Sequence, residues 1–231
     1  MIFTDRAEAG RNLAQKLNDY ANRDDVIVLG APRGGVPIAF EISSALNVPL
    51  DIFVLRKLGV PGHEELAFGA IASGGVRILD SDIVDACGLT SQDIERVTRD
   101  ETRELERRER AYRRGRLPLN VEGMTVILTD DGIATGSSMR AAIRALRQMK
   151  PSALVIATPV APHSTCERLR PLVDELVCLN MPEPFFGVGQ FYHDFSEVTD
   201  DEVNELLDRA WHRPNERQHE QVGSAQGRLR P

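Results

Sequence analysis

Two adjacent acids, Asp130 and Asp131, follow a short apolar run and precede a loop of small and hydroxylic residues. The loop reads Ala134-Thr135-Gly136-Ser137-Ser138 and leads into a helix-like stretch. Free N–H groups and the dipole at the start of a helix attract anions, so this loop is a candidate phosphate site. The acids would repel a phosphate, and the combination therefore indicates a ligand with a phosphate at one end and a diol nearby, as in a ribose 5-phosphate.

A second candidate anion loop is formed by Pro32, Arg33, Gly34 and Gly35, directly after the apolar run 26–30. Successive glycines after a strand can present consecutive N–H groups to an anion. Arg33 would add a forked positive charge that suits phosphate oxygens. A tight turn between a strand and a helix would use the same glycines, so this loop is weaker evidence than the first.

Further charged residues follow the apolar run 50–55. Arg56 or Lys57 could meet an anionic leaving group, or both could be surface charges at a strand end. The next loop could close over a site and exclude water. In that loop His63, Glu64 and Glu65 are candidates for a general base or a metal contact, although a loop histidine is often only solvated.

The elements that must position these residues alternate between strands and helices. Continuous apolar runs fit strands that are covered on both faces, as in a parallel sheet. They occupy residues 26–30, 50–55, 125–129, 153–158 and 175–179. The pattern predicts an α/β, doubly wound, mainly parallel sheet of about five strands with helices on both faces. Ligands of such sheets bind beyond the carboxyl ends of the strands, which is where every candidate loop lies.

Two segments depart from this alternation. Residues 56–75 are rich in glycine and predict a flexible loop or hairpin, in which 66–71 and 76–79 pair around 73–75. A charged helix is predicted over 91–114, with Thr90 as its N-cap and Asp93 at the capping-box position. Arginines recur on one face of that helix, at Arg96, Arg99, Arg103, Arg107, Arg110 and Arg114. We expect this helix to be solvated or to face a dimer partner; a phosphate-facing or RNA-facing role is the alternative.

The composition bounds the remaining possibilities. A chain of 231 residues suffices for one α/β domain, expected over 1–212, and the polar segment 213–231 is expected to be disordered. A net charge of -7 argues against general nucleic-acid binding. No apolar run is long enough to span a bilayer, and the N-terminus lacks the pattern of a signal peptide. These features predict a cytoplasmic protein without a nucleic-acid or membrane partner.

The acid pair and its loop resemble the signature of the type I phosphoribosyltransferases. The resemblance extends to the loop 32–35, to a flexible loop at 56–75 and to a variable hood at about 180–197. Within that family the chain is most similar to a bacterial branch without an assigned acceptor. The resemblance covers roughly the first two hundred residues.

This resemblance implies a donor, 5-phosphoribosyl 1-pyrophosphate (PRPP), used together with Mg²⁺. Asp130 and Asp131 would then accept hydrogen bonds from the ribose hydroxyls and reach the metal through water. The loop 134–138 would hold the 5-phosphate. The pyrophosphate would lie on Arg33, Gly34 and Gly35, with help from Arg56 or Lys57.

The resemblance assigns the acceptor to the hood, where Phe185, Phe186, Phe191 and Tyr192 could stack on a planar base or pack as ordinary core. The expected reaction is transfer of ribose 5-phosphate to a nitrogenous base or similar acceptor. A non-catalytic PRPP-binding sensor is the alternative, and a donor-hydrolysing or phosphatase-like enzyme is a weaker one. The acceptor, the direction of the reaction and the oligomeric state, with a homodimer one option, stay open.

Overall fold

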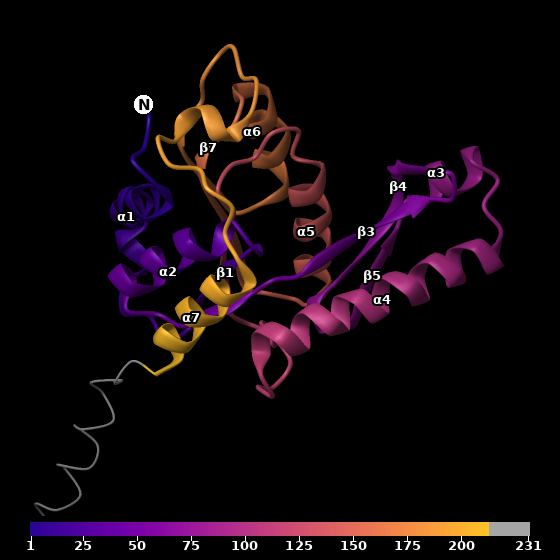
Figure 1. The fold of residues 1–231 in the computed structure, drawn as a ribbon, viewed down its shortest axis with the longest axis horizontal. Helices are drawn as coiled ribbons and strands as arrows, with labels where there is room; N and C mark the ends of the chain where they lie inside the picture. Colours follow the sequence, from indigo (N-terminus) through magenta and orange to yellow (C-terminus); the bar gives the residue numbers. More distant parts are fainter. Residues whose placement is uncertain (213–231) are drawn as a thin grey trace, which may run out of the picture.

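Five parallel strands form the central sheet of the computed structural model, which describes residues 1–212 (Figure 1). The order is β2-β1-β6-β7-β8, with β1 at Val26–Gly30, β2 at Leu50–Ile52, β6 at Thr125–Thr129, β7 at Ala153–Val160 and β8 at Glu175–Asn180. The predicted fold class and strand count are confirmed. The expected disorder of 213–231 lies outside the described residues.

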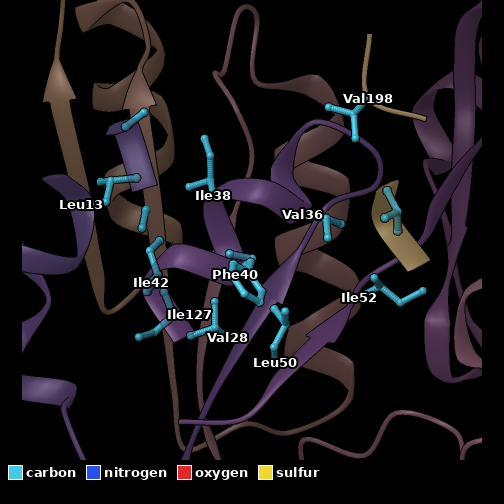
Figure 2. Close-up of a cluster of buried hydrophobic side chains, with 14 of the residues drawn as sticks. Leu13, Val28, Val36, Ile38, Phe40, Ile42, Leu50, Ile52, Ile127 and Val198 are labelled. Carbon is cyan, nitrogen blue, oxygen red and sulfur yellow. The ribbon is translucent and has the colours of Figure 1, made fainter. Parts of the chain in front are cut away.

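Helices cover both faces of this sheet. One face carries α1 (Arg6–Lys16), α2 (Gly35–Leu46) and α7 (Asp200–Trp211), and the other carries α5 (Ser137–Gln148) and α6 (His163–Leu169). Successive strand residues point to opposite faces. Val28 therefore packs with α1 and α2, as Figure 2 shows, whereas Leu29 packs in the cluster beneath α5. Both clusters are apolar, which explains the unbroken apolar runs in the sequence.

The order of the strands reverses at β1, which pairs with β2 on one side and with β6 on the other. The chain leaves β1 toward β2 and leaves β6 toward β7, in opposite directions along the sheet, and a crevice opens between two such strands. Here Gly30 pairs with Thr129, so the loops that follow β1 and β6 begin side by side. These are the two loops that the sequence marks as anion sites.

A second, antiparallel sheet projects from the body of the molecule as an arm (Figure 1). It consists of β3 (Leu55–Val60), β4 (His63–Ala72) and β5 (Val76–Leu79). The expected single strand over 50–55 was wrong, because β2 ends at Ile52 and β3 begins a different sheet at Leu55. The expected pairing around 73–75 is confirmed, and the glycine-rich segment is an ordered hairpin.

Two helices, α3 (Ser81–Ala86) and α4 (Ser91–Arg113), follow the arm. The predicted capping box of Thr90 and Asp93 is present at the start of α4. Short 3-10 turns complete the described elements at Asn18–Tyr20, Ser73–Gly75, Arg170–Leu172 and Val188–Phe191. None of the helices within residues 1–212 is long and apolar enough to cross a membrane.

Helix α4 runs along the arm and is fastened near its middle and at its C-terminal end. Arg56 on β3 donates to Glu101 at 2.6 Å, and the Tyr112 hydroxyl donates to Asp200 on α7 at 2.6 Å. The side chains of the arginine stripe at 96, 103, 107, 110 and 114 are all more than half exposed. The expectation of a solvated stripe is therefore met at these positions, although the helix as a whole is packed against the arm and α7.

Arg113 is the exception among these charges because it is buried. Its guanidinium donates to Asp51 at 2.9 Å and to the Ile52 carbonyl oxygen at 3.3 Å, and so joins α4 to the end of β2. Burial raises the pKa of Asp51, and the charge of Arg113 opposes that rise. Removing one partner of a buried pair leaves the other charge without compensation.

Arg113→Met is therefore expected to lower the free energy of unfolding by about 3 kcal/mol. Arg110→Met is the matched control, because Arg110 lies on the same helix with an exposed pair to Glu106, and we expect a change within about 0.5 kcal/mol. Urea unfolding of both variants measures the difference. Equal, small losses would show that the Arg113 pair does not fasten α4.

Candidate functional site

The two acids lie together at the carboxyl end of β6, at the reversal of the sheet. The backbone N–H of Asp131 donates to the Asp130 carboxylate at 2.9 Å, which orients the first acid. Burial and the charge of Asp131 together raise the pKa of Asp130 to about 8. Burial also raises the pKa of Asp131. Two carboxyl groups so close to each other and so poorly hydrated resist simultaneous ionisation, which makes them sensitive to any ligand that supplies hydrogen bonds or positive charge.

Arg6, at the start of α1, compensates the second acid. Its Nε lies 2.9 Å from the Asp131 carboxylate, and both side chains are largely buried. The same guanidinium stacks at 4.0 Å over the ring of Phe195 and donates to the Ser196 carbonyl oxygen at 2.8 Å. Arg6 thus links the acid pair to the hood.

The loop 32–35 packs directly onto the acids. A Cβ atom on Gly34 would lie 2.0 Å from the Asp131 carboxylate, and one on Gly35 would lie 2.6 Å from the Thr129 carbonyl oxygen. Any larger residue would collide there. The N–H of Gly35 donates to the Ala31 carbonyl oxygen at 2.9 Å, so it is not part of the row of free N–H groups that the sequence suggested. The peptide bond between Pro32 and Arg33 is cis.

The phosphate loop that the sequence predicts sits at the N-terminus of α5, which begins at Ser137. Gly136 caps the helix with a φ of 77°, a conformation that favours glycine. Ala134, Thr135, Ser137 and Ser138 are exposed, and the Thr165 hydroxyl fixes the loop by donating to the Ala134 carbonyl oxygen at 2.7 Å. Hydroxyls and helix N–H groups are thus available to an anion.

A cavity of about 810 Å³ connects the two loops with the arm and α4. Pro32, Asp130 and Ser138 line it on the side of the sheet, and four cationic side chains line it elsewhere: Arg56, Lys57, Arg96 and Arg108. Lys57 donates to the Ser137 hydroxyl at 3.1 Å, so it lies next to the phosphate loop. Arg56 is held by Glu101. Of the three candidates His63, Glu64 and Glu65, Glu64 lines this cavity, whereas His63 and Glu65 are exposed and do not.

A smaller cavity of about 400 Å³ lies on the hood side of the acid pair. Arg6, Asp131, Arg33 and Phe195 line it, and Arg33 is paired with Glu197 of the hood. Asp130 faces the larger cavity and Asp131 the smaller one. The loop 32–35 lies between the two cavities, since Pro32 belongs to the first and Arg33 to the second.

The aromatic side chains of the hood differ in exposure. Phe191 and Tyr192 are buried, and the Tyr192 hydroxyl donates to the Asp131 carbonyl oxygen at 2.6 Å. Phe185 stacks on Phe191 with ring centroids 5.5 Å apart. Phe186 is 85% exposed. Of the four candidates for stacking on an acceptor, Phe186 offers by far the most free surface.

Most of the chain matches a known protein family. A family model described as a phosphoribosyl transferase domain matches residues 3–196. The chain belongs to this family. The match begins at the N-terminal segment and ends in the hood, so it includes Arg6, both loops, the arm and α4.

Two Mycobacterium tuberculosis proteins, from strains CDC 1551 and H37Rv and provisionally named phosphoribosyl transferases, are each 46% identical over 209 residues. That alignment covers 90% of this chain, and the chain spans about half (47%) of the length of these relatives. The crystal structure of TT1426 from Thermus thermophilus is 39% identical, with a TM-score of 0.80 over 90% of this chain and 98% of that one.

Sequence reasoning missed two parts of the site. Arg6 marks only the beginning of the first helix in the sequence, and Phe195 only the end of the hood. No local pattern identifies either of them, because the contacts of Arg6 with Asp131 and Phe195 join distant segments, next to the bridge between Phe3 and Tyr192. Arg6 and Asp131 are 125 residues apart, so a periodic sequence pattern, which relates near neighbours, does not reveal their contact.

The raised pKa of Asp130 predicts that Asp130→Asn stabilises the fold in a pH-dependent way. The carboxyl has a pKa of about 8 when folded and near 3.8 when unfolded, so the unfolded chain holds fewer protons between these values. Wild-type stability should therefore fall as the pH rises through this window, by at most about 1.4 kcal/mol per pH unit. Thermal unfolding at pH 5, 6, 7 and 8 should show a growing advantage for the variant.

Asp131→Asn should have the opposite effect. It removes the charge that compensates Arg6, and an unpaired buried guanidinium costs on the order of 1–3 kcal/mol. A lower melting temperature for this variant, beside a higher one for Asp130→Asn, would confirm that the two neighbouring acids have different environments. Identical shifts for the two variants would contradict it.

Proposed function

We propose that this protein is an enzyme that transfers ribose 5-phosphate from PRPP to a nitrogenous base or a similar small acceptor and releases pyrophosphate. One observation carries the proposal: Asp130, Ser138 at a helix N-terminus that suits a phosphate, and the cations Arg56 and Lys57 line one cavity. A phosphorylated ribose with a diphosphate on C1 has the matching sequence of groups. Family membership supports transferase chemistry of this type.

In this proposal the residues divide the donor between them. The loop 134–138 binds the 5-phosphate, and Asp130 and Asp131 accept hydrogen bonds from the ribose hydroxyls. Arg56 and Lys57 face the diphosphate in the larger cavity, and Arg33 leaves Glu197 in the smaller cavity to join them. The acids also support positive charge that develops on the ribose as the bond between C1 and the leaving oxygen breaks. The arm and α4 border the cavity and keep water from the reacting carbon.

The arrangement also fits Mg²⁺ that enters with the donor. Within residues 1–212 no group of three or more histidine, cysteine or acidic side chains could hold a metal alone. Mg²⁺ commonly keeps several waters and is held by one or two carboxylates together with substrate phosphates, which is what Asp130 and Asp131 can offer. The ion would neutralise charge on the leaving diphosphate.

The proposal extends to the cell: a cytoplasmic enzyme acting on two small molecules, without nucleic acid or membrane. A PRPP-binding sensor is the second candidate, because the same donor site would serve it. A sensor would bind PRPP but would not transfer its ribose 5-phosphate to an acceptor. Turnover therefore separates the two functions, and binding alone does not.

The decisive assay measures pyrophosphate release from PRPP and Mg²⁺ with a panel of purine and pyrimidine bases. We expect release that depends on an acceptor and is lost, by at least about a hundredfold, in Asp130→Asn/Asp131→Asn, because two sets of hydrogen bonds to charged groups disappear. Calorimetry with PRPP is the companion measurement. Tight binding of PRPP with no release for any base would favour the sensor, and no binding would refute both functions.

Phe186 is the hood residue most able to touch an acceptor. Phe186→Ala should raise the KM for the acceptor by about fivefold or more, the usual loss when one base–aromatic stack is removed, with the KM for PRPP unchanged. The melting temperature should stay the same, since the ring is exposed. An unchanged KM for the acceptor would place acceptor binding elsewhere, and the smaller cavity beside Phe195 is the next candidate.

A further inference from the structure

Two arginines of α4 line the large cavity: Arg96, which belongs to the stripe, and Arg108, which does not. Arg108 lines the cavity together with Pro32, Lys57 and Asp130, whereas its neighbour Arg107 does not. Arg107 is more exposed, with 60% of its side chain accessible against 38% for Arg108. The two residues are adjacent in the sequence, yet they face different surroundings.

Both arginines share one acid, and they share it unequally. Arg107 makes two bonds to Glu104, at 2.7 and 2.9 Å, and so occupies both of its carboxylate oxygens. Arg108 reaches Glu104 only through its Nε, at 2.9 Å. Within residues 1–212 the two terminal nitrogens of Arg108 have no hydrogen-bond partner. These atoms form the half of a guanidinium that binds phosphate oxygens in pairs.

Contacts of α4 on either side of Arg108 hold this part of the helix beside the cavity. Glu101, two turns earlier, is bonded to Arg56, and Tyr112, one turn later, is bonded to Asp200. The charges of Arg108 and Arg33 both oppose the rise in the pKa of Tyr112 that burial and Asp200 cause. Both guanidiniums therefore lie within electrostatic range of the same hydroxyl, and Arg108 lines the same cavity as Pro32 of the loop 32–35.

We propose that Arg108 is an additional anion-binding residue of this site and contacts the diphosphate of the donor and the pyrophosphate product. It would do so through its two terminal nitrogens while Glu104 holds its Nε. This inference rests on the proposed function and deepens it, because it gives α4 a part in binding. It also explains why a helix of exposed charges is fastened so firmly to the arm and to α7.

The test compares Arg108→Gln with its matched control Arg107→Gln. Each variant removes one positive charge and one partner of Glu104 from the same turn, but only Arg108 lines the cavity. Calorimetry with inorganic pyrophosphate and Mg²⁺ should show binding weakened about tenfold or more by Arg108→Gln, the usual effect of losing charge-assisted hydrogen bonds. Arg107→Gln should stay within about twofold of wild type, since exposed charges contribute little.

A second readout separates binding from stability. Arg108→Gln should raise the KM for PRPP and leave the KM for the acceptor unchanged, with a melting temperature equal to that of Arg107→Gln. Arg108→Lys, which keeps the charge but loses the fork, should bind pyrophosphate with intermediate affinity and covers the case in which the glutamine variant fails to fold.

The possible failures are distinct. Equal pyrophosphate affinities for the two glutamine variants, or full affinity in Arg108→Lys if only that variant folds, would overturn the role of Arg108 and leave the proposed function standing. A wild-type protein that binds neither pyrophosphate nor PRPP would overturn the proposed function, and this inference with it.

Discussion

Asp130 and Asp131 are adjacent carboxyl groups at the carboxyl end of β6, where the strand order reverses, and they have little access to water. Like charges that cannot be hydrated raise each other's free energy, so the surroundings must compensate them. The compensation comes from distant parts of the chain. Arg6 supplies the opposite charge, and the Tyr192 hydroxyl fixes the backbone at Asp131. Gly34 leaves the second carboxylate the room it occupies. The N-terminal helix, the first loop and the hood are thus all built around the acid pair.

The arm and α4 place cationic side chains beside the acids that follow β6. Arg56 and Lys57 extend from the hairpin, and Arg108 faces the same cavity from the helix. Each has a carboxylate or hydroxyl partner nearby, at Glu101, Ser137 and Glu104. These partners hold the long side chains in place without covering them. The cavity thus holds cationic side chains together with Asp130, which suits a ligand that carries both hydroxyls and phosphates.

Sequence patterns predicted the parts of this fold that local physics determines. Apolar runs located the five parallel strands, with the extent of β2 wrong, because a strand covered on both faces has no polar side. Thr90 and Asp93 marked the start of α4, since the capping box is a contact between residues three apart. What failed depends on distant contacts. The run 50–55 is mostly apolar, although the chain passes from one sheet to the other within it. Phe53 and Leu55 pack in or against the core beyond the end of β2, so the apolar pattern does not reveal where the strand ends. The position of Arg6 follows from a bridge between the two ends of the domain.

The same distinction explains why the two candidate anion loops could be located from the sequence and the packing of the hood could not. The loops 32–35 and 134–138 each lie between a strand and a helix, so their geometry is set by backbone positions that a short motif encodes. The hood is irregular, and its aromatic residues look alike in sequence. Phe191 and Tyr192 nevertheless serve the core, Phe195 supports Arg6, and Phe186 remains exposed. Which ring meets a ligand is decided by packing over the hood as a whole. The hood can therefore change by repacking a few rings while the acid pair and its two loops, which different elements hold, keep their arrangement.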